Sequence, residues 1–385
     1  MKRISILLVA ATSFAVPACT SDGPTGGGDD GSGSGSGSAD EWDTLLGTRE
    51  YDYNAALKIA ALRLTGDAPT MDEIMGVQNA PDLAAKKAAY ETQIRAYMAR
   101  PTFTRQMMAF WRDTFKMGET AELDAAPAFA TQLSVDNRSY LELFTATTGN
   151  CPTIDAGLTT VTAANCTGTG PQAGVLTNQG AMKQFYSNFA FRRVRWVQET
   201  FDCAKFPIEI SPTPTDVGGA APYIGVWPFQ SISGLSTGRV NFQDVSAVVC
   251  ANCHQSLNHI APLFANFDIM GAYKTTISVP TPLDNAPMAQ LTDYLPPTET
   301  TAWRYQVPAA DLPSLGMAMA GDKAVQTCGV ARIWNWALGK TDIVDTLQEV
   351  PADTIQAQVD AFAANGFKMK DLIYAVYTAD DFVKF

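Results

Sequence analysis

The chain has 385 residues, of which 46% are hydrophobic, and its formal net charge is −12. This length and hydrophobic content are sufficient for a folded body with a large core. The acidic balance argues against nucleic acid and anionic lipid surfaces as binding partners, and it is compatible with a basic partner protein.

The first segment, residues 1–18, has the features of an export signal. Two basic residues precede an apolar run that is too short to cross a bilayer. The run ends in "VPAC", which resembles the lipobox of bacterial lipoproteins and identifies Cys19 as the lipidated residue. Thr20 then favours an outer-membrane lipoprotein, on the periplasmic face or the cell surface, with lipid as its only membrane attachment. The alternative is an ordinary signal peptide cut near Ala18.

The remaining chain divides by composition into a tether and a body. The tether is rich in Gly, Ser and Asp, which cannot bury apolar area, so it is expected to be a flexible coil. The predicted segments are a tether at 19–40, an N-terminal helical domain at 41–145, a loop-rich middle region at 146–240 with a helix at 181–203, a c-type haem-binding region at 241–310 and a C-terminal helical domain at 311–385.

Helices are predicted over residues 50–117 of the N-terminal segment. Apolar residues recur at helical spacing up to Gly66, and Thr70 begins a second helix with a capping-box pattern. Two further amphipathic stretches are separated by Pro101 and end at Gly118, and a last helix is expected over 124–145.

The rest of the body alternates between irregular segments and helices. Residues 146–180 are rich in Thr and Gly and predict a loop or small hairpin, and residues 205–238 are expected to be irregular. Short strands are expected within 275–310, and helices return to the end of the chain, one of them ending at Gly339. The predicted fold is mainly α, with several helical subdomains joined by long Pro/Gly-rich connections around a cytochrome-c-like haem-binding region.

Four cysteines lie in the body outside the motif described next, and an exported chain can keep disulfides. Four cysteines allow three pairings. We favour Cys151 with Cys166, which closes the Thr/Gly-rich loop, and Cys203 with Cys328. Free buried thiols are the alternative.

The stretch "VVCANCHQSLNH" contains the Cys-x-x-Cys-His sequence to which c-type haem is attached. Two thiols one helical turn apart can each bond a vinyl group of one porphyrin, and the next residue lies beneath the ring. Cys250 and Cys253 are therefore the predicted thioether links and His254 the axial ligand of a single covalent haem c. The second nitrogen of His254 is expected to donate to a backbone carbonyl.

Two other chemistries use similar cysteine spacing. A redox dithiol belongs to a strand-to-helix turn, which the flanks do not show. Zinc needs four ligands, and His259 is the one further histidine in the chain. His259 lies about 7.5 Å along a helix from His254 and cannot reach the opposite face of the same haem. We expect it to be structural or to contact a propionate, with ligation of a haem in another subunit as a minor alternative.

The motif itself does not supply the sixth ligand of the haem iron. Met317 is the candidate, at a spacing usual for small c-type cytochromes, and Met319, Met270 and Met288 are alternatives, as is an open position. Two strong ligands favour electron transfer, whereas an open position favours binding or peroxide chemistry. The aromatic residues proposed to wall the haem are Phe264, Phe267 and Trp303, with ordinary core packing preferred for Trp303.

Several stretches resemble the planctomycete-type cytochrome-c-like proteins, exported proteins built from several domains of unknown function. "ALRLTGDAPTMDEI", "YMARPTFTRQMMAFW" and "CGVARIWNWALGK" are similar to motifs that occur in this order in the family. "CANCHQSLNHIAPLFANFDIMG" matches the family's haem segment without gaps, although Asn258 and His259 replace its Asp-Pro and Ala261 replaces its Gly. The resemblance implies an exported protein with covalent haem and does not imply a particular reaction.

These features predict a lipid-anchored, mono-haem c-type cytochrome-like protein that transfers one electron to or from a redox partner protein. An electron carrier is favoured over a catalyst. The alternatives are a non-redox surface binding or scaffolding protein whose haem is structural or absent, and a small haem peroxidase-like enzyme. A peroxidase would need a distal acid–base residue, for which His259 or a carboxylate is available.

Overall fold

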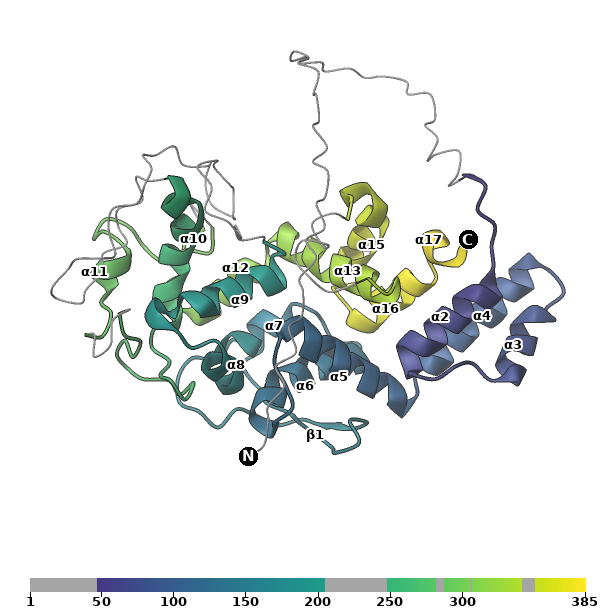
Figure 1. The fold of residues 1–385 in the computed structure, drawn as a ribbon, viewed down its shortest axis with the longest axis horizontal. Helices are drawn as coiled ribbons and strands as arrows, with labels where there is room; N and C mark the ends of the chain where they lie inside the picture. Colours follow the sequence, from purple (N-terminus) through teal and green to yellow (C-terminus); the bar gives the residue numbers. More distant parts are fainter. Residues whose placement is uncertain (1–46, 205–247, 282–286, 305–306, 341–349) are drawn as a thin grey trace, which may run out of the picture. The chain divides into compact units, whose positions relative to one another are not determined.

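The computed structural model describes residues 47–204, 248–281, 287–304, 307–340 and 350–385 (Figure 1). Contacts divide the chain into a short first unit, Met1–Arg49, and a body, Glu50–Phe385. The predicted export signal, the lipidated Cys19 and the tether lie outside the described residues. The predicted division of the body into four segments stays a prediction.

Helices make up most of the described body, which confirms the mainly α class. The helices are α2 (Tyr53–Thr65), α3 (Met71–Gln78), α4 (Leu83–Tyr97), α5 (Pro101–Phe115), α6 (Ala121–Val135), α7 (Glu142–Thr145), α8 (Gln179–Gln184), α9 (Phe191–Phe201), α10 (Val248–Phe264), α11 (Leu291–Tyr294), α12 (Leu312–Ala320), α13 (Lys323–Ala337), α15 (Ala352–Ala364), α16 (Met369–Tyr377) and α17 (Asp380–Val383), with the 3-10 turns η1 (Gly174–Thr177) and η2 (Asn188–Ala190).

The local signals for the first helices are confirmed. Helix α2 ends at Gly66, whose φ of 81° is the left-handed conformation that glycine adopts most easily. Thr70 and Glu73 form the predicted capping box of α3. Helix α5 ends at Phe115, slightly before the predicted end at Gly118, because Lys116 already adopts a left-handed conformation.

The single helix predicted over 124–145 is wrong: α6 ends at Val135 and α7 begins at Glu142. Between them Asn137 has a φ of 54°, a conformation that Asn tolerates better than most residues. Its side-chain oxygen accepts hydrogen bonds from the backbone N–H groups of Lys370 and Asp371 at the start of α16. The break therefore lets a residue of the N-terminal half cap a helix of the C-terminal half.

The helix predicted over 181–203 is also interrupted, because it divides into α8, η2 and α9. Phe189 and Ala190 have φ values of 55° and 58°, which cannot belong to a continuous right-handed helix. Phe189 is buried, and its backbone N–H donates to the carbonyl of Pro280 at 3.1 Å. Tertiary contacts compensate this strained turn, and local sequence patterns do not reveal such contacts.

The region 146–180 forms the predicted small hairpin, in which β1 (Thr153–Ile154) pairs antiparallel with β2 (Val161–Thr162). Within 275–310 the described residues show isolated β-bridges and α11 in place of the expected strands. The segment 205–238, which was expected to be irregular, lies outside the described residues.

Both favoured disulfides are present. Cys151 and Cys166 join the ends of the hairpin loop, with their Cα atoms 4.8 Å apart. Cys203, directly after α9, is joined to Cys328 in α13, with a Cα separation of 5.5 Å. The second bond ties the middle of the chain to the C-terminal helices.

The two ends of the body also meet. Glu50 and Phe385 exchange a pair of backbone hydrogen bonds of 3.0 Å each. Helix α16 contacts α4 and α6, and α17 contacts α2. The C-terminal helices are therefore part of the same packed body as the N-terminal ones.

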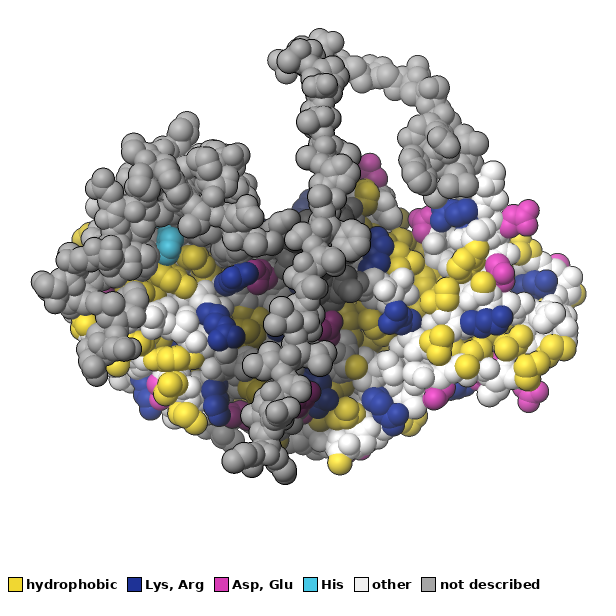
Figure 2. Space-filling view, viewed as in Figure 1, with side chains coloured by type: hydrophobic (Ala, Val, Ile, Leu, Met, Phe, Trp, Pro, Cys, Tyr) yellow, Lys and Arg dark blue, Asp and Glu magenta, His cyan; other side chains and the backbone are white. Residues whose placement is uncertain are grey.

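The surface shown in Figure 2 mixes basic, acidic and hydrophobic side chains over the described residues, without a broad patch of one charge. No helix among the described residues is both long enough and apolar enough to span a bilayer.

Replacing Cys203 and Cys328 together by alanine is expected to lower the free energy of unfolding by roughly 2–4 kcal/mol, because the bond closes a long loop in the unfolded chain. The matched control is the double alanine variant of Cys151 and Cys166. The sequence separations are 125 and 15 residues, so the control is expected to lose less. Urea unfolding measures both, and a larger loss in the control would contradict this account.

Candidate haem-binding site

Helix α10 carries the Cys-x-x-Cys-His motif near its start, and Figure 1 shows it with α9 and α11, which it contacts. Cys250, Cys253 and His254 fall within about one turn of this helix, as the attachment chemistry requires. The side chains of the two cysteines lie outside the described residues, so their thioether role stays a prediction.

The His254 ring is held by a residue one turn further along α10. Its Nδ1 lies 3.1 Å from Oδ1 of Asn258, a side-chain amide oxygen where a backbone carbonyl was expected. Burial lowers the pKa of His254, and the bond to Asn258 offsets only part of that effect. The imidazole is therefore neutral at pH 7, and donation from Nδ1–H places the lone pair on Nε2, which would be the atom that ligates a haem iron.

One aromatic residue contacts this ring, and two more pack against that residue. Phe191 meets the His254 ring edge to face at a centroid distance of 4.9 Å. Phe189 stacks on Phe191 at 5.4 Å, and Tyr294 contacts both of them at 5.3 and 6.0 Å. We call Phe189, Phe191 and Tyr294 the aromatic wall. The sequence reasoning missed these three residues, because the left-handed turn at 189–190 brings them together.

Two buried polar atoms near α10 have no hydrogen-bond partner among the described residues, namely the hydroxyl of Tyr294 and Oε1 of Gln198. Tyr294 lies on α11, which contacts α10, and the amide nitrogen of Gln198 donates to Ser256 on α10. An unsatisfied buried polar atom costs about 1–3 kcal/mol. A haem presents an apolar ring and acidic propionates, so an aromatic wall that carries a spare phenol fits such a group.

His259 is a structural residue of this helix. Its Nε2 lies 3.0 Å from Oε2 of Glu299, and its backbone carbonyl accepts a hydrogen bond of 3.1 Å from Ala302. Both contacts tie the segment 299–302 to α10. This arrangement agrees with the expected local role of His259.

The far end of α10 is held by Arg193 of α9, which is completely buried. Its guanidinium donates to the backbone carbonyls of Met182, Phe264, Phe267 and Asp268 at 2.6–3.0 Å. Burial lowers the pKa of Arg193 to about 10, so the group keeps its charge at neutral pH. One side chain therefore connects α8, α9 and the end of α10.

Helix α9 is itself fixed at its C-terminal end. Arg332 of α13 donates to the carbonyls of Glu199 and Thr200, both at 2.7 Å. The Cys203–Cys328 disulfide joins the same two elements. Helix α9, which α10 contacts, is thus anchored to the C-terminal helices. The guanidinium of Arg332 satisfies carbonyls that the end of a helix leaves without an intrahelical partner.

The wall residues predicted from the sequence are core residues. Phe264, Phe267 and Trp303 are all buried. The indole nitrogen of Trp303 donates to Asp322 at 2.8 Å, and Asp322 also pairs with Arg304. This placement agrees with the ordinary core role preferred for Trp303.

The candidate sixth ligands are not brought to α10 by the described contacts. Met317 lies on α12, whose main contacts are with α7, η1 and α13, and its side chain is 64% exposed. Met270 and Met288 are also exposed, and Met319 is buried in the core.

No three His, Cys, Asp or Glu side chains among the described residues are close enough together to share a metal ion, and the side chains of Cys250 and Cys253 lie outside that set. Comparison with family models, curated proteins and solved structures finds no match to the chain.

Replacing Asn258 by leucine in the haem-free polypeptide is expected to lower the pKa of His254 further, because burial remains while the hydrogen bond to Nδ1 is lost. Leucine resembles asparagine in shape, because both side chains branch at Cγ. A ¹⁵N NMR titration of the two histidines measures the change. A higher pKa in the variant would show that the amide does not stabilise the protonated ring.

Proposed function

We propose that this chain is a mono-haem c-type cytochrome-like protein that exchanges one electron with a partner protein. The observation that carries the proposal is the neutral, oriented His254 directly after Cys-x-x-Cys on one helix, beside an aromatic wall. Bound haem would supply a one-electron iron couple. The resemblance to planctomycete-type cytochrome-c-like proteins supports the same cofactor.

In this proposal Cys250 and Cys253 hold the porphyrin and His254 ligates its iron. Asn258 keeps the imidazole in the tautomer whose Nε2 can ligate. Tyr294 offers a hydroxyl to an acidic group of the porphyrin edge.

Location belongs to the proposal as well. Lipidated Cys19 and the following tether would attach the body to the outer membrane, facing the periplasm or the outside. An exported location supports covalent haem and agrees with the two disulfides.

The peroxidase-like alternative receives less support from the described residues. A distal acid–base group must be able to exchange a proton with a ligand on iron. His259 is held by Glu299 and lies on the same helix as the axial ligand. A scaffolding role without redox chemistry would leave the orientation of His254 and the spare phenol of Tyr294 unexplained.

A spectroelectrochemical titration of the purified full chain tests the proposal. We expect one haem that is reduced and reoxidised in a single one-electron step. A chain whose haem does not change redox state, or whose main activity is rapid peroxide turnover, would contradict electron transfer.

Replacing Met317 by leucine is expected to leave the haem spectrum unchanged, since the Met317 side chain is largely exposed on α12. The measurement is the near-infrared band of methionine sulfur bound to ferric iron, compared between the wild-type protein and the variant. Loss of such a band in the variant would show that α12 rearranges and supplies the sixth ligand.

A further inference from the structure

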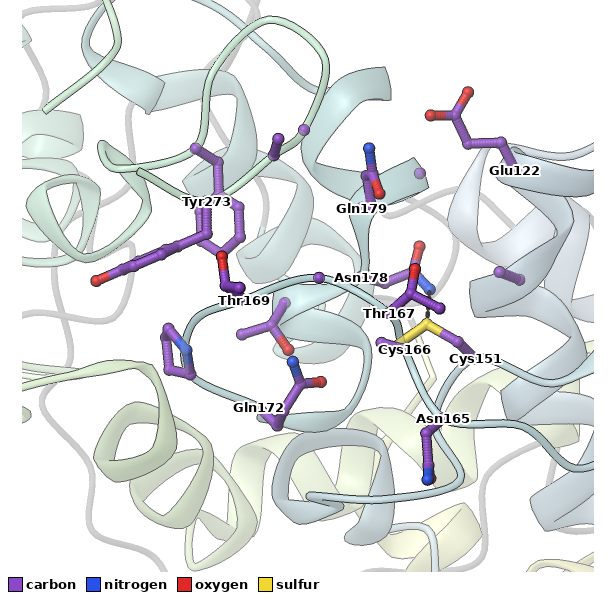
Figure 3. A pocket seen from close by; sticks show the side chains of 18 of the residues that line it. Glu122, Cys151, Asn165, Cys166, Thr167, Thr169, Gln172, Asn178, Gln179 and Tyr273 are labelled. Carbon is purple, nitrogen blue, oxygen red and sulfur yellow. Dashed lines mark hydrogen bonds between the residues drawn. A yellow bond between two sulfur atoms is a disulfide. The ribbon is translucent and has the colours of Figure 1, made fainter. Parts of the chain in front are cut away.

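A cavity of about 540 Å³ lies beside the hairpin disulfide, and no residue of the aromatic wall lines it. Figure 3 shows Gln172 and Gln179 on opposite sides of this hollow, with Tyr273 across from Cys151 and Cys166. Its size falls within the range of roughly 300–1,000 Å³ found for small-ligand sites. None of its residues takes part in the proposed electron transfer.

The walls of the cavity are held rigidly. The Cys151–Cys166 disulfide forms part of the lining. At Gly271, where φ is 70°, an added Cβ would come 2.1 Å from the carbonyl oxygen of Gln179, and one at Gly180 would come 2.2 Å from that of Glu122. The segments that surround the cavity therefore touch at their backbones, so little ordering is required before a ligand binds.

The charges at the cavity are compensated within the protein. Glu122 forms an ion pair with Lys183 at 2.6 Å, and Lys274 forms one with Asp268 at 3.1 Å. The lining therefore carries no unpaired charge that would select an ion.

The neutral side chains offer both donors and acceptors. The oxygen of Gln172 accepts a hydrogen bond from Asn150 at 3.1 Å, which leaves its NH₂ group for a ligand. The nitrogen of Gln179 donates to the carbonyl of Met270 at 3.2 Å, which leaves its oxygen. Thr167 and Thr169 are exposed at the cavity, and their hydroxyls can both donate and accept.

Apolar atoms make up more of the lining than polar atoms, but they do not come from large aliphatic side chains. Besides Tyr273, the apolar part consists of Ala, Pro, Cys and Phe side chains, and the described lining contains no Leu, Ile, Val or Met. A peptide ligand needs pockets for its side chains, and these are built mainly from such residues. Fixed donors, fixed acceptors and one half-exposed aromatic ring suit a small molecule with many hydroxyl groups.

We propose that this cavity binds a neutral saccharide of one or two sugar rings, with Gln172, Gln179, Thr167 and Thr169 contacting its hydroxyl groups. This site is independent of the haem site and of electron transfer.

Titration calorimetry of the purified full chain with maltose, cellobiose and N,N′-diacetylchitobiose tests the proposal. We expect at least one of these probes to bind with a dissociation constant on the order of 1 mM or tighter. The double variant Thr167→Val/Thr169→Val keeps the shape of both side chains, and neither hydroxyl hydrogen-bonds to a described residue. It is expected to weaken binding about tenfold or more while leaving the melting temperature unchanged.

The matched control is Thr160→Val/Thr162→Val, two exposed threonines of the same hairpin that do not line the cavity. It should bind like the wild-type protein, and Gln179→Leu provides a second cavity variant if the first does not fold. Absence of binding to all three sugars at about 10 mM would overturn the proposal. Binding of the sugars by the cavity variants as tightly as by the wild-type protein would also overturn it. Digalacturonate, an acidic sugar, and trialanine, a peptide, are tested in the same way, and binding of only one of these two would overturn the proposal of a neutral saccharide.

Discussion

The variant Cys250→Ser/His254→Ala is expected to carry no covalent haem and to be colourless. It removes one of the two proposed thioether links and the proposed axial ligand, so only Cys253 would be left to hold the porphyrin, which we expect to be insufficient for stable attachment. Helix α10 places the two residues within about one turn, so the same haem would lose one thioether link and its axial ligand together. A pyridine haemochrome spectrum of the denatured protein measures the covalent haem that remains.

The control for this loss is Cys151→Ser/Cys166→Ser. These two cysteines are joined to each other in the hairpin, so removing them takes two sulfur atoms from the chain without touching the motif. This control is expected to keep its haem. Covalent haem retained in Cys250→Ser/His254→Ala, or lost in the control, would refute the assigned attachment site.

The second large effect is expected from Arg193→Met, which should lower the free energy of unfolding by roughly 3–5 kcal/mol. Methionine fills part of the volume but donates no hydrogen bond. Four backbone carbonyls that now accept from the guanidinium would be left buried without that donor. Because these carbonyls join α8 to the end of α10, the variant should also loosen the end of α10.

Arg192→Met is the matched control, since Arg192 lies next to Arg193 on α9 but is exposed. Arg192→Met is expected to change the free energy of unfolding by less than about 0.5 kcal/mol. Arg193→Lys should be nearly as damaging as Arg193→Met, because a lysine keeps the charge but cannot reach the same set of carbonyls with its single nitrogen. Urea unfolding measures all three variants, and equal stability of Arg192→Met and Arg193→Met would contradict the role given to Arg193.

Local signals in the sequence predicted much of the helical framework. The capping box at Thr70, the glycine at position 66 and the proline at 101 act within one or two turns of chain, and the structure places helix boundaries at or beside each of them. The disulfides were also predicted correctly. Helix boundaries depend on interactions within one or two turns of the chain. The disulfides had to be chosen from only three possible pairings of four cysteines.

The parts that sequence reasoning missed depend on contacts between distant residues. The left-handed turn at Phe189 and Ala190 is compensated by the burial of Phe189 and its bond to Pro280. The same turn brings Phe191 beside His254. The motif could thus be located from its spacing alone, whereas the aromatic wall around it could not.

The partner of His254 shows the same limit. A hydrogen bond to its second nitrogen was expected on chemical grounds, and the position of Asn258 four residues later allowed it. Which oxygen supplies that bond depends on side-chain packing, and here it is a buried amide instead of a backbone carbonyl.

The most direct test of the central claim is the intact mass of the mature exported chain, recorded together with its visible spectrum after expression with c-type haem maturation. The account predicts a polypeptide heavier by one haem, with a Soret band that survives denaturation. A mass explained by the amino acids, disulfides and lipid alone, without Soret absorbance, would contradict it.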